Sequence, residues 1–103
     1  MTKMKYLYSL MHDDLKDADM EIGYAEKLMN VDKDEAKYYV DEAMKRLSSF
    51  STRHEKFEKL VSKYTADHPN EKSDNACWSM AHEYFVDWYL KMKSKIDALN
   101  KMY

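Results

Sequence analysis

The sequence predicts an all-α fold, a bundle of three long antiparallel helices that run up, down and up. Apolar side chains recur at alternating steps of four and three residues, the spacing that keeps one helix face against neighbouring helices. The chain has only one glycine and one proline, so it lacks the turn residues of β-rich proteins. Its 103 residues suit a single domain, 1–103.

The first helix is expected from about Met4 to Met29. Its apolar stripe consists of Met4, Tyr8, Met11, Leu15, Ala18, Ile22, Ala25 and Met29. Three leucines beside this stripe, Leu7, Leu10 and Leu28, widen the apolar arc. We therefore expect this helix to contact two surfaces, one of which belongs to another subunit.

The second helix is expected from Asp32 to about Tyr64, because Asp32 and Glu35 resemble a capping box. Its stripe consists of Ala36, Val40, Ala43, Leu47, Phe50, His54, Phe57, Val61 and Tyr64. Eight of these nine residues are apolar or aromatic, and His54 is the exception. We expect His54 to be a buried polar residue that hydrogen-bonds to a neighbouring Tyr, Ser or Asp.

Residues 66–73 form the predicted loop before the third helix, since Pro69 disfavours a helical His68. Ser73, Asp74 or Asn75 is expected to cap that helix, which runs to about Lys101. Its stripe consists of Trp78, Ala81, Phe85, Trp88, Met92, Ile96, Leu99 and Tyr103. Cys77 is expected in the core, and as the single cysteine it fits a reducing compartment, the cytoplasm.

Composition and charge exclude several classes of function. The 17 basic and 19 acidic residues are spread evenly, so nucleic-acid binding is disfavoured. No apolar run approaches the length of a membrane span, and no glycine-rich phosphate loop occurs. A weaker alternative is single-stranded nucleic-acid binding by third-helix aromatic residues and the lysines that follow, namely Trp78, Tyr84, Phe85, Trp88 and Tyr89 with Lys91, Lys93 and Lys95.

The leading hypothesis is a non-enzymatic interaction or oligomerisation protein without a cofactor. Its partner would be a second copy or another protein. Apolar and aromatic residues at the edges of the stripes are the candidate interaction surface, namely Leu7, Leu10, Leu28, Trp78, Trp88 and Tyr89.

Two segments resemble the small ferritin-like helical proteins of tailed phages and prophages of Gram-positive bacteria. The first is the acidic run Asp13–Asp19 followed by Tyr24-Ala25, and the second is Leu47-Ser48 followed by His54. The C-terminal residues 100–103 are similar as well. The resemblance implies a ferritin-like hairpin with a third helix, and a phage accessory or assembly role.

The resemblance also implies an alternative function, metal binding by His54 with Asp14, Asp17 or Glu21 on the first helix. In the family's pattern an acidic residue precedes the histidine by three positions. Ser51 occupies that position here, so the Glu-x-x-His pair that carboxylate-bridged metal sites in bundles require is missing. Ser79 likewise stands three residues before His82.

Overall fold

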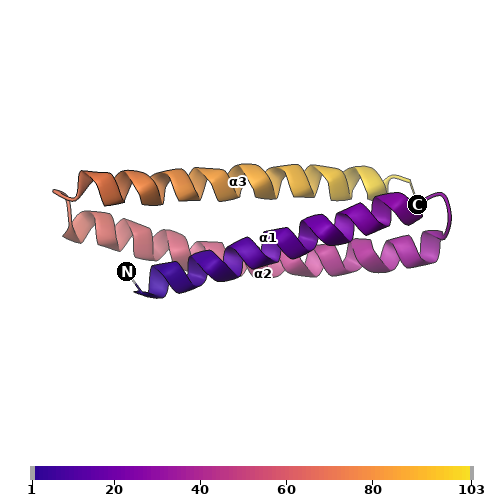
Figure 1. Ribbon diagram of the computed structural model, residues 1–103, viewed down its shortest axis with the longest axis horizontal. Coiled ribbons are helices and arrows are strands. Elements are labelled where there is room, and N and C mark those ends of the chain that lie inside the picture. Colours follow the sequence, from indigo (N-terminus) through magenta and orange to yellow (C-terminus); the bar gives the residue numbers. More distant parts are fainter. Residues whose placement is uncertain (1, 103) are drawn as a thin grey trace.

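The computed structural model describes residues 2–102, which form three α-helices and no strand (Figure 1). They are α1 (Thr2–Leu28), α2 (Lys33–Asp67) and α3 (Lys72–Asn100). The helices run up, down and up in a rod whose Cα atoms span 55 × 18 × 15 Å. The predicted all-α, three-helix bundle is confirmed.

The predicted stripes form the core. Every member of the first stripe is buried except Tyr8, which is half-buried. On α2 the stripe members from Ala36 to Phe57 are buried, except His54, which is half-buried. On α3 the core consists of Phe85, Met92, Ile96 and Leu99. Tyr103, the last residue of the predicted third stripe, lies outside the described residues.

The helix ends follow local hydrogen bonding. Asp32 caps α2 as predicted, because its Oδ1 accepts a hydrogen bond from the backbone N–H of Glu35 at 3.1 Å. The prediction that Ser73, Asp74 or Asn75 caps α3 is wrong, because α3 begins at Lys72 with Glu71 in the cap position. Glu71 offers no side-chain cap, since its carboxylate accepts a hydrogen bond from the Tyr64 hydroxyl instead.

The three helices do not pack equally. α1 packs most extensively against α2, whereas α3 makes far fewer contacts with either helix. The N-terminal end of α1 does not reach the connection between α2 and α3. The last part of α2 and the first part of α3 therefore extend beyond α1 (Figure 1). The result is a close α1–α2 pair with a more loosely held third helix.

The placement of Cys77 corrects one expectation. Cys77 is exposed rather than buried in the core. The next residue, Trp78, packs against the core, whereas Cys77 lies on the exposed side of the same turn of α3. In the described part of the chain, none of the helices is both long and apolar enough to cross a membrane.

Candidate functional site

Two of the three carboxylates of the alternative metal site, those of Asp14 and Glu21, are paired with arginines instead. Both carboxylate oxygens of Asp14 accept hydrogen bonds from Arg53 Nη1 at 2.8 Å. Glu21 Oε1 accepts a hydrogen bond from Arg46 Nε at 3.2 Å. Asp17 is half-buried on α1, between these two residues. These contacts join α1 to α2, and they leave none of the three carboxylates beside His54.

Burial dominates the electrostatics of these carboxylates. It raises the pKa of Asp14 above its ordinary value of 3.8, although the hydrogen bond and charge of Arg53 act in the opposite direction. Burial likewise raises the pKa of Glu21, and Arg46 opposes the change. The two arginines therefore offset only part of the desolvation of these acidic groups at the α1–α2 interface.

His54 contacts a second histidine. Its Nε2 lies 3.0 Å from Nδ1 of His82 on α3, and the two rings are stacked with centroids 4.8 Å apart. The other face of the site is aromatic, since Phe50 stacks on His54 at 5.4 Å. His82 Nε2 lies 3.7 Å from Glu58 Oε1. His54 has a hydrogen-bonding neighbour as predicted, although that neighbour is a histidine and His54 is half-buried rather than buried.

The geometry of this histidine pair is that of a hydrogen bond. Two imidazole nitrogens that bind one ion tetrahedrally at about 2.0–2.1 Å lie about 3.3 Å apart, which is wider than the separation of His54 and His82. Among residues 2–102, no group of three or more His, Cys, Asp or Glu residues is arranged to hold a metal ion. The two facing nitrogens hold one hydrogen between them, because a second would set two N–H groups against each other.

The stability of the bundle is expected to depend on pH through His54. Burial and the neighbouring His82 lower the pKa of His54 below 6.5, and Glu58 raises it only partly. The neutral ring therefore contributes stability above about pH 6.5, and that contribution is lost as the pH falls through the lowered pKa. We expect the free energy of unfolding to decrease between pH 7.5 and pH 5.5, as measured by urea denaturation.

The control for this pH dependence is His54→Gln, which cannot be protonated in that range. Comparing the two proteins at each pH removes the contribution of other groups, including Asp14 and Glu21. An equal change in stability with pH in both proteins would contradict the assignment to His54.

An open groove lies between α1 and the first half of α3, with a volume of about 530 Å³. Its lining is mostly apolar and consists of Tyr8, Asp74, Cys77, Trp78, Met80, Ala81 and Tyr84. Met80 is 68% exposed and Tyr84 is 53% exposed. Tyr84 also contacts Trp88 at 5.6 Å, and Trp88 contacts His12 of α1 at 5.5 Å. The groove thus continues into an aromatic cluster along α3.

Of the six predicted interaction residues, one is buried and five are half-buried. Leu7 is buried in the core, with 7% of its surface exposed, so it is not available to a partner. Leu10 and Leu28 are half-buried. The aromatic residues Trp78, Trp88 and Tyr89 are half-buried and pack against the core. Of the six, Trp78 lines the groove and Trp88 adjoins it, through Tyr84.

Sequence reasoning missed the exposed residues Cys77, Met80 and Tyr84. A signal exists for Cys77 and Tyr84, because α3 carries a second stripe that overlaps the predicted one at Ala81 and Trp88, whereas Met80 lies outside both stripes. This second stripe also advances by alternating steps of four and three residues, and it consists of Cys77, Ala81, Tyr84, Trp88, Lys91, Lys95, Ala98 and Met102. Two lysines interrupt it, which hides it in a search for uniformly apolar spacing.

The aromatic residues of the nucleic-acid alternative are mostly engaged in packing. Phe85 is fully buried and contacts Tyr8, Phe50 and Phe57. Tyr89 stacks on Phe50 at 5.4 Å. Among these aromatic residues, only Tyr84 is exposed. Their faces are therefore largely occupied by other side chains of the bundle.

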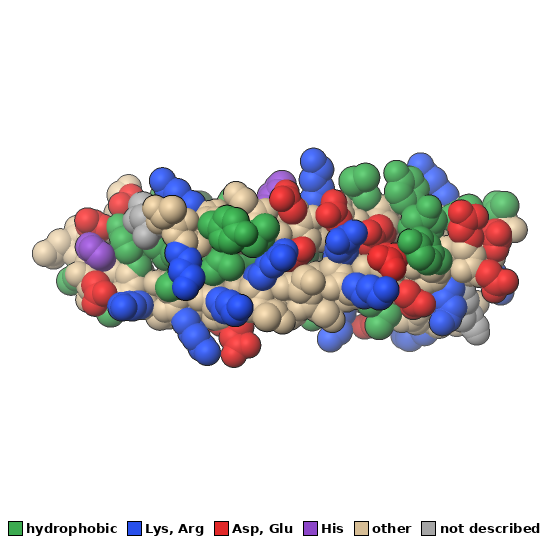
Figure 2. Space-filling model, turned by 90° about the horizontal axis from the view of Figure 1, so that it is seen from below, with side chains coloured by type: hydrophobic (Ala, Val, Ile, Leu, Met, Phe, Trp, Pro, Cys, Tyr) green, Lys and Arg blue, Asp and Glu red, His purple; other side chains and the backbone are tan. Residues whose placement is uncertain are grey.

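A second group of exposed aromatic residues lies where α1 ends and α2 begins. Tyr24 and Tyr39 have ring centroids 5.3 Å apart, and Tyr38 and Tyr39 have centroids 5.2 Å apart. Figure 2 shows hydrophobic side chains near that end of the molecule, at the right, among acidic and basic ones. This group provides a comparison surface for tests of the groove.

Comparison with known proteins gives no match to a family model, to a curated protein or to a solved structure. The resemblance to small ferritin-like phage proteins therefore stays a prediction.

Proposed function

We propose that this chain is a non-enzymatic interaction protein that associates with a second copy of itself through the groove between α1 and α3. The observation that supports this is the exposure of Met80 and Tyr84 next to half-buried Tyr8 and Trp78. Apolar surface that continues outward from the core is typical of a contact with another protein. A self-association surface also suits the phage or prophage assembly role that the sequence resemblance implies.

The size of the surface supports a second copy as the occupant. The chain exposes 6812 Å², whereas a compact protein of 12.4 kDa exposes about 6,100 Å². The rod shape thus exposes about 700 Å² more than a compact protein of this mass, and an elongated bundle gains stability by burying part of its surface against a second copy. The net charge of −2 opposes such pairing only weakly. The lone thiol of Cys77 fits a reducing compartment, and we place the protein in the cytoplasm.

The first test is the mass in solution by sedimentation equilibrium at tens of micromolar. We expect the wild type to have twice the 12.4 kDa of the chain. Met80→Glu places a charge in the groove and is expected to give a monomer, because an unpaired charge is costly at a buried interface. Met20→Glu is the matched control, since Met20 is 51% exposed on α1 outside the groove. It should leave the dimer intact.

Two results would contradict the proposal. One is a wild type that remains a monomer at hundreds of micromolar. The other is a dimer that Met80→Glu leaves intact but Tyr38→Glu dissociates, because the interface would then lie at the tyrosine group near the start of α2.

A further inference from the structure

We propose that the two copies lie side by side and parallel, with a two-fold axis along the rod, so that α1 of each copy packs against α3 of the other. This inference rests on the proposed self-association. It identifies two charged residues as partners across the interface, Asp19 on α1 and Lys95 on α3.

The first step is the pattern of residues on the groove face. The second stripe of α3 is apolar or aromatic from Cys77 to Trp88 and basic at Lys91 and Lys95. On α1, residues of this face recur every seven positions, namely Lys5, His12, Asp19 and Glu26. A seven-residue repeat keeps side chains in line along a helix. The face of α3 is therefore apolar in its first half and basic in its second half, whereas the face of α1 changes from basic at Lys5 to acidic at Asp19 and Glu26.

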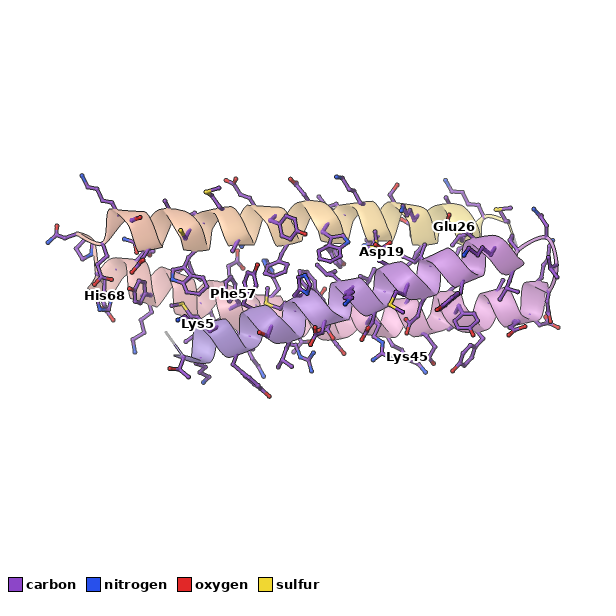
Figure 3. The ribbon with its side chains drawn as sticks, viewed as in Figure 1. Lys5, Asp19, Glu26, Lys45, Phe57 and His68 are labelled. Carbon is purple, nitrogen blue, oxygen red and sulfur yellow. The ribbon has the colours of Figure 1, made fainter. Side chains whose placement is uncertain are left out.

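The second step is the register between the two helices. Tyr8 contacts Phe85 at 5.0 Å and His12 contacts Trp88 at 5.5 Å. Because α1 and α3 run in the same direction with the same rise per residue, Asp19 lies level with Lys95. Figure 3 shows Asp19 and Glu26 on α1 in the region between the ribbons of α1 and α3.

The third step is that no ion pair within residues 2–102 engages these charges. Asp19, Glu26, Lys91 and Lys95 are all exposed. The ion pairs of residues 2–102 lie within α2, between α1 and α2, or between α2 and α3, and none joins α1 to α3. Opposite charges at one level of the rod are thus available to a partner.

The parallel arrangement satisfies both halves of the face at once. A two-fold axis along the rod keeps each residue at its level and sets α1 against the partner's α3. The apolar residues of the groove then meet those of the other copy, and Asp19 of each α1 faces Lys95 of the other copy. An antiparallel pair with full overlap would instead place the lysines of one copy over the apolar half of the other, which costs their desolvation.

The experiment mixes two single variants. In an Asp19→Lys homodimer, like charges face each other twice, and the same holds for Lys95→Glu. We expect each variant to dissociate about tenfold more readily than the wild type at low ionic strength. A mixed dimer restores attraction at both places. Native mass spectrometry of an equal mixture should therefore show about nine-tenths mixed dimer, against about half for random pairing.

The matched control replaces Lys93, which lies on another face of α3 beside Ser51 and Thr52 of α2. Lys93→Glu mixed with Asp19→Lys should give fewer mixed dimers than Lys95→Glu does. Random pairing in the Lys95→Glu mixture, with stable wild-type dimers, would overturn the parallel arrangement and leave self-association standing. A monomeric wild type would overturn both.

Discussion

Replacing Phe57 with alanine is expected to lower the free energy of unfolding by about 3–5 kcal/mol. Phe57 has no exposed surface. Its ring packs edge-on against Trp78 at 5.8 Å and Phe85 at 6.4 Å, so it joins α2 to α3. A cavity at this position removes packing from α3, the helix that has the fewest contacts with the other two. Few other contacts therefore remain to hold α3 in place.

Urea denaturation of Phe57→Ala and wild type checks this expectation. Tyr38→Ala is the control, because Tyr38 is aromatic but 58% exposed, and it should change stability by no more than about 1 kcal/mol. A loss below about 1 kcal/mol in Phe57→Ala would show that the inward face of α2 is misassigned.

Replacing Arg53 with methionine is expected to cost about 3 kcal/mol at pH 8. The variant leaves the carboxylate of Asp14, whose side chain is 8% exposed, buried without its partner. The pKa of Asp14 is already raised by burial, and loss of Arg53 raises it further. Protonation relieves the unpaired charge, so the difference from wild type should become smaller as the pH falls towards 5.

The matched control is Lys59→Met, which removes an ion pair with Glu55 in which both side chains are largely exposed. It should change stability by less than about 0.5 kcal/mol at either pH. Stability losses of equal size in the two variants, independent of pH, would argue against a buried ion pair between α1 and α2.

The core was predictable because burial follows helical periodicity, which a single sequence displays. Met11, Leu15 and Phe57 are buried as their spacing requires. The pairing of His54 with His82 was not predictable in the same way. The two residues are 28 positions apart, and their contact depends on the register between α2 and α3, which the spacing within either helix leaves undetermined.

The groove was missed for a related reason. Leu7 looked like a surface residue because it lies beside the predicted stripe, yet the buried arc of α1 is wide enough to include it. Cys77 was expected in the core because a free cysteine is among the most commonly buried residue types, yet it is exposed. The way the helices face one another decides both positions, and this is a property of the assembled bundle.

The unequal packing of the helices determines which structural change tryptophan fluorescence detects. Both tryptophans, Trp78 and Trp88, belong to α3, the helix with the fewest contacts to the rest of the bundle. Indole emission is therefore a readout of the docking of one helix, whereas backbone circular dichroism averages over all three.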